Sequence, residues 1–264
     1  MSYDLSHIER IAQRCADAAR AAILPHFRQQ GLTAENKETE SFDPVTVADR
    51  AAEQAMRAIL TQECPDDAIL GEEFGNKPGT TGLTWVLDPI DGTRGFISGT
   101  PTWGVLIGVT DPNGVIFGLI DQPYIQERFV GHSGQAWVNG PMGHNILRAR
   151  PAAPLSDAIM FTTFPEVGTQ AEGRAFHAVA QHTKLVRYGC DCYGYALVAA
   201  GQIDLVIEAQ LKAYDVCGPI GVVEGAGGLV TNWQGEPAHN GGQIIAAANA
   251  DIHAEALRIL KASE

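Results

Sequence analysis

A short stretch from Trp85 to Thr93 (WVLDPIDGT) sets two carboxylates and a turn at the end of an apolar run. Asp88 and Asp91 each offer hard oxygen ligands of the kind that Mg²⁺ prefers. Gly92 and Thr93 can turn backbone N–H groups and a hydroxyl toward an anion. The stretch therefore predicts a place where a divalent metal and a phosphate group are held together.

A second pair of acids follows another apolar run. Glu72 and Glu73 come directly after residues 68–70, just as Asp88 comes directly after residues 85–87. Both acid sets therefore leave predicted strands of one core. Because α/β and α+β enzymes collect ligands at strand ends, we expect these carboxylates to converge.

Two further acids fall at predicted helix starts. Asp49 lies in the first turn of a helix that opens at Thr46 and stops before Pro65. Asp215 begins a helix that runs to the glycine-rich segment 225–228, and this helix N-terminus adds positive potential toward a bound phosphate. A single such acid is typical of a solvated surface or a helix cap, and Asp215 fits an ordinary N-cap. Only the joint context of these acids favours a site.

The remaining pattern predicts an α+β first half and an α/β second half. An amphipathic helix from Leu5 ends near Pro25. After the helix that carries Asp49, strands are expected at residues 68–70, 84–87, 105–110, 115–120 and 127–131, with a hairpin turn at 111–114. The second half alternates strands at 159–162, 184–187, 204–208 and 229–231 with helices at 171–181, 192–200, 215–226 and 250–261.

Composition narrows the class of protein. With 264 residues and 45% hydrophobic content, the chain fits a structured protein of enzyme size. A net charge of −13 without a basic cluster argues against nucleic acid and against an anionic membrane surface. The five cysteines are odd in number and form no C-x-x-C pair, and no signal peptide or apolar span is recognised, so we expect a soluble protein of the cytoplasm.

Several of these segments together resemble the inositol monophosphatase superfamily of Mg²⁺-dependent, Li⁺-sensitive phosphomonoesterases. The resemblance rests on Glu72-Glu73, the segment from Asp88 to Thr93, and Asp215 followed by Glu224 to Gly228. Order and spacing match along nearly the whole chain, from Asp43-Pro44-Val45-Thr46 to the last helix. The resemblance implies a layered αβαβα sandwich of α+β and α/β character, and usually a homodimer.

The resemblance also implies a role for each matching residue. Glu72, Asp88 and the carbonyl of Ile90 would hold one Mg²⁺, and Asp88, Asp91 and Asp215 a second. A third, weaker ion would sit by Glu72, and Mn²⁺ is a substitute metal. Asp49 and Thr93, counted with Glu72 as catalytic, would orient and deprotonate a water, while Asp91, Gly92 and Thr93 would hold the phosphate. Two ions can clamp both oxygens of an in-line displacement, so no phosphoenzyme is needed.

Two subdomains are expected to meet near the segment 151–154. Residues 1–150 would form an α+β subdomain that carries most metal ligands. Residues 151–264 would form an α/β subdomain that carries Asp215 and the residues for substrate specificity. No flexible linker separates them, so the boundary is a seam inside one compact body.

A competing interpretation of the same stretch is the aspartyl-phosphate phosphatase motif. That motif places two Asp one residue apart before Gly-Thr, near the N-terminus of a Rossmann-like domain. Asp88 and Asp91 have two residues between them, which changes the side chains that converge. Trapping with beryllofluoride would distinguish the two mechanisms.

The predicted substrate is a small-molecule phosphate ester. The segment from Arg187 to Tyr193 and Glu208 should face the leaving group, and Asp191 stands where inositol-specific members have a small neutral residue. With Arg94-Gly95-Phe96, this resembles the histidinol-phosphate phosphatases of the superfamily, which serve histidine biosynthesis. Asp191 and Glu208 would bind the ammonium of histidinol phosphate, with Arg187 also at the substrate; Asp191 could instead cap the helix 192–200.

Two alternatives stay open on the sequence alone. One is an inositol-phosphate or broad sugar-phosphate phosphatase of the same superfamily. The other is a catalytically silent scaffold. The presence of all the acids and of Thr93 argues against it.

Overall fold

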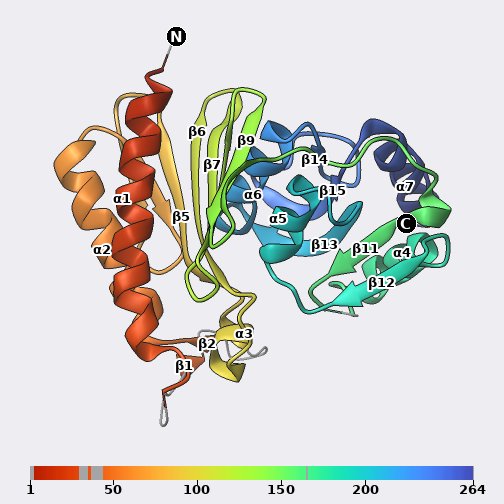
Figure 1. Ribbon diagram of the computed structural model, residues 1–264, viewed down its shortest axis with the longest axis horizontal. Coiled ribbons are helices and arrows are strands. Elements are labelled where there is room, and N and C mark those ends of the chain that lie inside the picture. The colour runs from red at the N-terminus through yellow and green to blue at the C-terminus, as the bar shows by residue number, and fades with distance from the viewer. Residues whose placement is uncertain (1–2, 30–34, 37–43, 165, 264) are drawn as a thin grey trace.

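Helices and sheets alternate in layers in the computed structural model, which describes residues 3–29, 35–36, 44–164 and 166–263 (Figure 1). Helices α1 (Leu5–Ile23) and α2 (Val47–Glu63) cover one face of an eight-stranded sheet. Helices α5 (Tyr193–Ala199) and α6 (Ala213–Gly225) lie between that sheet and a five-stranded sheet. Helices α4 (Gln170–Ala180) and α7 (Ala250–Ser263) cover the far face of the smaller sheet. This confirms the predicted αβαβα sandwich; Asp43 of the signature lies outside the described residues.

The larger sheet has the strand order β10-β9-β8-β7-β6-β5-β3-β4. Its strands are β3 (Ala68–Gly71), β4 (Gly75–Lys77), β5 (Thr84–Asp91), β6 (Gly104–Asp111), β7 (Gly114–Gln122), β8 (Glu127–His132), β9 (Gln135–Gly140) and β10 (Gly143–Ile146). Strands β3 and β5 pair in parallel and the other pairs are antiparallel. The expected hairpin at 111–114 joins β6 to β7, whereas β4, β9 and β10 were not anticipated.

The smaller sheet has the order β12-β11-β13-β15-β14. Its strands are β11 (Ile159–Thr162), β12 (Leu185–Tyr188), β13 (Leu205–Lys212), β14 (Leu229–Thr231) and β15 (Gly241–Ala247). Short elements complete the described fold: strands β1 (Glu35–Asn36) and β2 (Pro44–Val45), helix α3 (Thr93–Ser98), and single 3₁₀ turns at Leu24–His26 and Leu155–Asp157. No helix in the described ranges is long and apolar enough to cross a membrane.

Glycines at the contact allow α6 to pack closely against the larger sheet. A Cβ added to Gly118 would lie 2.2 Å from the carbonyl oxygen of Gly218, and one added to Gly131 would lie 2.3 Å from that of Gly221. Helix backbone and strand backbone therefore touch directly, which larger side chains would prevent. This close approach brings the first turn of α6, with Asp215, to the end of β5.

Candidate active site

A β-bulge places Asp88 and Asp91 on the same side of β5. Asp88 pairs with Leu106 of β6 and Asp91 pairs with Gly104, so β5 has one extra residue between the two pairs. In a regular strand, residues three apart point to opposite faces. The extra residue in β5 turns the side chain of Asp91 to the same face as that of Asp88. Pro89 lies inside the bulge, where the missing N–H costs no ladder hydrogen bond.

Asp215 joins them from α6. The helix begins at Ala213, two residues before the predicted start, and Asp215 Oδ2 accepts a hydrogen bond of 2.6 Å from Lys212 N. The expectation of an N-cap is therefore wrong, because the side chain reaches back from the third helical position. Its other oxygen is left to face the two β5 acids.

The three acids form a tight, largely buried cluster. Ligand oxygens of Asp88, Asp91 and Asp215 lie within 4.8 Å of one another. Burial, followed by the charges of Glu72 and Asp91, raises the pKa of Asp88 well above its ordinary value. Burial, followed by the charge of Asp191, raises that of Asp91, and burial raises the pKa of Asp215 to about 6. Ionising this cluster without a counter-ion is therefore costly.

The cavity around the cluster is strongly acidic. Its volume is about 570 Å³, and Arg94 is its one cationic side chain among the described residues. Seven acids line it: Glu72, Asp88, Asp91, Glu166, Asp191, Glu208 and Asp215. Hard carboxylate oxygens with uncompensated charge fit a divalent cation. The carbonyl of Ile90 also lines the cavity; it accepts 3.0 Å from the Thr93 hydroxyl and has a second lone pair for a metal.

Glu53 fixes the turn that carries Glu72. Its side chain is fully buried, and it accepts hydrogen bonds from the backbone N–H of Glu73 at 2.6 Å and of Phe74 at 3.2 Å. Arg57 donates to the same carboxylate at 2.7 Å. Sequence reasoning missed Glu53, because an acid four residues before an Arg is typical of an exposed helical ion pair.

The phosphate turn follows the bulge. Gly92 has φ 81°, a left-handed conformation that glycine adopts without strain, and it caps α3. Gly92 and Thr93 both line the cavity beside Asp91. Their role in binding phosphate stays a prediction, for which the turn offers backbone N–H groups.

Asp49 is buried in the first turn of α2, and it does not line the cavity. Its Oδ2 accepts from Thr46 N at 2.8 Å and from Thr46 Oγ1 at 2.6 Å, and burial raises its pKa to about 6. Within the described part of the chain its Oδ1 is buried without a hydrogen-bond partner. In this structure Asp49 is bonded to Thr46, and Thr93 is bonded to the carbonyl of Ile90. That Asp49 and Thr93 act together on a water molecule therefore stays a prediction.

Asp191 and Glu208 meet on the other wall of the cavity. Asp191 Oδ2 accepts 2.9 Å from the Thr102 hydroxyl, so the alternative of a helix cap is wrong: Cys192 holds the N-cap position of α5. Glu208 accepts from Tyr195 Oη at 2.7 Å and from Thr163 N and Oγ1 at 3.0 and 2.5 Å. Both acids line the same cavity as the cluster of Asp88, Asp91 and Asp215.

Arg187 lies elsewhere. It is exposed on β12, the edge strand of the smaller sheet, and is not part of the cavity lining. The chain turns toward the cavity only after that strand ends at Tyr188. The predicted contact of Arg187 with substrate therefore has no support in this geometry.

The comparisons with known proteins agree with this geometry. A sequence model of the inositol monophosphatase family matches residues 4–264. The chain belongs to the inositol monophosphatase family. It is therefore a phosphatase, acting on phosphoric monoesters, of a family that depends on metal ions.

Named relatives in the family differ in substrate. "Bifunctional phosphatase IMPL2, chloroplastic" of Arabidopsis thaliana is 38% identical, over 98% of this chain and 76% of the relative. A "Histidinol-phosphatase" of Chlorobaculum parvum is 31% identical, over 91% of each chain. A solved inositol monophosphatase from Zymomonas mobilis is 38% identical with a TM-score of 0.87, over 98% of this chain and 100% of that one.

Proposed function

We propose that the chain is a Mg²⁺-dependent phosphatase that hydrolyses histidinol phosphate to histidinol and phosphate, a step of histidine biosynthesis. One observation carries the choice of substrate: Asp191 and Glu208 line the same cavity as the metal cluster. Histidinol phosphate carries an ammonium and an imidazole, whereas inositol phosphates carry neutral hydroxyls. A pair of buried carboxylates needs a cation, and this substrate brings one.

In this proposal Asp88, Asp91, Asp215, Glu72 and the Ile90 carbonyl hold two or three Mg²⁺ ions. Bound metal supplies positive charge to the phosphate and lowers the pKa of a coordinated water. The chain itself holds the ester: Gly92 and Thr93 offer N–H donors to the phosphate, and Asp191 and Glu208 hold the leaving group.

Proton transfer falls to Asp49 and Thr93. The unpartnered Oδ1 of Asp49 is an acceptor without a donor among the described residues, and such buried acceptors are rare unless a ligand serves them. We propose that it takes the proton of the attacking water through Thr93, whose hydroxyl rotates from Ile90 when the substrate binds.

An inositol 1-phosphate phosphatase is the second candidate. The likeness to the Zymomonas mobilis inositol monophosphatase favours it, as do neutral polar groups in the cavity wall, among them Thr162, Thr163 and Gln210. Hydroxyl and amide groups of this kind suit a polyol.

Phosphate release from the two esters tests the proposal. With Mg²⁺ at neutral pH, kcat/KM for histidinol phosphate should exceed that for inositol 1-phosphate by about tenfold or more, which is worth at least about 1.4 kcal/mol of transition-state binding. A tenfold preference for the inositol ester would overturn the assignment of substrate.

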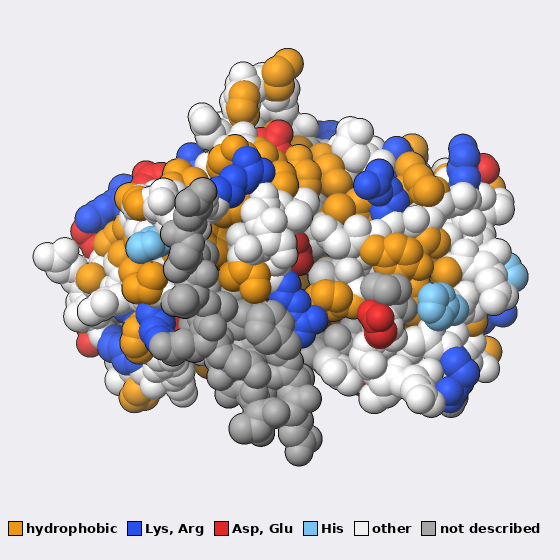
Figure 2. All heavy atoms as spheres, turned by 90° about the horizontal axis from the view of Figure 1, so that it is seen from below, with side chains coloured by type: hydrophobic (Ala, Val, Ile, Leu, Met, Phe, Trp, Pro, Cys, Tyr) orange, Lys and Arg blue, Asp and Glu red, His pale blue; other side chains and the backbone are white. Residues whose placement is uncertain are grey.

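Location and assembly are further proposals. We propose that the protein is located in the cytoplasm, although the Arabidopsis relative is chloroplastic. We also propose that it forms a homodimer, which light scattering would test. We also propose that the protein has no nucleic-acid partner. On the face of the molecule that Figure 2 shows, Lys and Arg side chains are dispersed instead of gathered in one patch.

A further inference from the structure

Asp191 is wedged into a notch in the phosphate turn. Its backbone is left-handed, with φ 47°. A Cβ added to Gly92 would lie 2.5 Å from Asp191 Cγ, and one added to Gly95 would lie 3.1 Å from Asp191 Oδ2. The absence of side chains at these two glycines therefore makes the room that the carboxylate occupies.

The loop backbone is fixed independently of this carboxylate. The N–H of Cys192 donates 2.6 Å to Asp91 Oδ2, which ties the loop to the metal cluster. Gly194 N also donates 3.1 Å to the Asp191 carbonyl as α5 begins. What remains to be fixed is the direction of the Asp191 side chain within the notch.

The two acids of the leaving-group wall are held very differently. Glu208 receives three hydrogen bonds, from Tyr195 and from the N–H and hydroxyl of Thr163. In the described part of the structure, Asp191 receives one side-chain hydrogen bond, from Thr102. Loss of a single donor would leave Glu208 with two others, whereas loss of the Thr102 hydroxyl would leave the Asp191 carboxylate without a hydrogen bond to the described side chains.

We propose that Thr102 is the positioning residue for substrate choice, because its hydroxyl aims Asp191 at the cationic leaving group. The inference rests on the proposed function. Thr102 stands on the segment between α3 and β6, so one hydroxyl links that segment to the loop before α5. This bond leaves Oδ1 without a hydrogen bond to the described residues while Oδ2 is held.

The test is a set of variants measured on two esters. Thr102→Val removes the donor and keeps the shape, and Thr102→Ser restores the donor. Thr102→Val should raise KM for histidinol phosphate about tenfold, the effect of one hydrogen bond to a charged group, with kcat changed less than about twofold. Both constants for inositol 1-phosphate should stay within about twofold of wild type, and Thr102→Ser should recover most of the loss.

Two readouts separate this role from a structural one. In an Asp191→Ala background, Thr102→Val should have no further effect on KM for histidinol phosphate, because the two side chains act as a unit. Mg²⁺ binding by calorimetry should match wild type in Thr102→Val, which shows an intact metal site.

Each contrary result has a distinct meaning. Equal losses on both esters, an additive loss in the Asp191→Ala background, or no rescue by Thr102→Ser would overturn the role of Thr102. A wild-type enzyme that prefers inositol 1-phosphate would overturn the proposed function, and this inference with it.

Discussion

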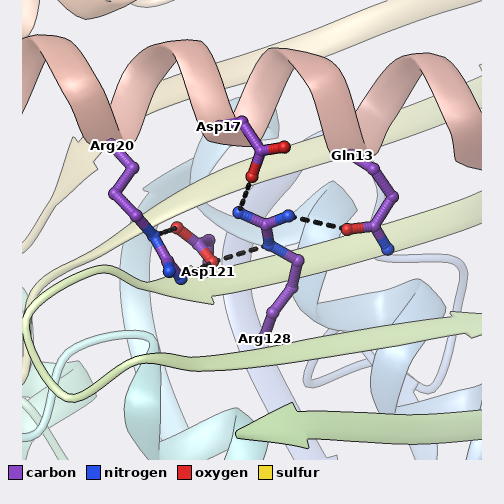
Figure 3. Close-up of polar contacts among 5 residues, drawn as sticks. All are labelled: Gln13, Asp17, Arg20, Asp121 and Arg128. Atoms are coloured by element: carbon purple, nitrogen blue, oxygen red, sulfur yellow. Dashed lines mark hydrogen bonds and ion pairs between the residues drawn. The ribbon is translucent and has the colours of Figure 1, made fainter.

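The buried acid Asp121 and the buried acid cluster of the active site have opposite surroundings. Asp121 is fully buried at the end of β7, where Arg20 of α1 donates to its two oxygens at 2.6 and 3.1 Å (Figure 3). Arg128 of β8 donates to it at 2.7 Å, and also bonds Gln13 at 2.7 Å and Asp17 at 2.8 Å. The chain supplies the counter-charges itself, and the network clamps α1 onto the larger sheet.

The cluster of Asp88, Asp91 and Asp215 lies in a cavity where Arg94 is the one cationic side chain among the described residues. Burial raises the pKa of all three acids, and neighbouring carboxylates raise those of Asp88 and Asp91 further, whereas the N–H and the charge of Lys212 lower that of Asp215. The difference teaches how to tell two kinds of buried acid apart: an acid paired within the chain supports the fold, whereas acids left facing one another are held ready for a ligand.

Asp91→Asn should give the largest effect. It would remove a charged ligand from the proposed metal site, where bound metal would supply several kcal/mol of transition-state stabilisation, so kcat should fall on the order of 10³-fold or more. The same change should raise the melting temperature of the metal-free protein at pH 7.5, because the ionised form is disfavoured there. Steady-state kinetics and thermal unfolding in EDTA measure the two effects.

Asp157→Asn, at an exposed acid, is the matched control and should change neither quantity. An Asp91→Asn enzyme with wild-type activity would remove the distinction between Asp121 and the acid cluster.

Asp121→Asn should show the reverse pattern. It removes the counter-charge of the partly buried Arg20 and leaves Arg128 with Asp17 alone, so the free energy of unfolding should fall by about 3 kcal/mol. Activity per folded molecule should stay within about twofold, because Asp121 does not line the active-site cavity. Urea unfolding monitored by circular dichroism measures the loss, and an unchanged unfolding midpoint would contradict a structural role.

The acid cluster also gives the stability of the protein a dependence on pH. Asp215 has its pKa raised from 3.8 to about 6, so the folded state binds that proton more tightly than the unfolded chain does. Its contribution to stability is full below about pH 4 and is lost as pH rises through 6, on the order of 2 kcal/mol. Mg²⁺ should reverse the trend, since ligands must be deprotonated to bind metal.

Unfolding in EDTA from pH 4.5 to 7.5, compared with Asp215→Asn, isolates this contribution. The difference between the two proteins should favour the variant increasingly as pH rises. A difference that is independent of pH would show that Asp215 titrates normally.

Asp191→Ala should give the smallest effect, confined to one substrate. KM for histidinol phosphate should rise about tenfold, while inositol 1-phosphate should be affected less than about twofold. Glu166→Ala is the matched control, because Glu166 lines the same cavity but is exposed. Equal losses on both esters would mean that Asp191 only supports the loop.

The sequence predicted the acids of this site better than their geometry. The apolar run before Asp88 predicts a strand that ends at residue 87, but β5 runs on to Asp91, so Asp88 lies inside the strand beside its bulge. The bulge that turns Asp88 and Asp91 to one side depends on pairing with β6, which no local pattern encodes. Asp215 was expected at the first position of its helix, and only the structure shows how its side chain reaches back to Lys212.

Long-range contacts were also beyond the sequence. Thr102 and Asp191 are 89 residues apart, and nothing near either residue indicates the other. Strand β15 was missed because its glycine-rich start, Gly241-Gly242, is typical of a loop, and the strand is ordered by its neighbours β13 and β14. Such features arise from tertiary pairing, so local propensity cannot specify them.

Calorimetric titration of Mg²⁺ into the metal-free protein tests the central claim most directly. At pH 7.5 wild type and Asp121→Asn should bind Mg²⁺ with similar affinity, while Asp91→Asn should lose at least one site. Binding that is unchanged in Asp91→Asn, or absent from wild type, would contradict the account of the unpaired acids as a metal site.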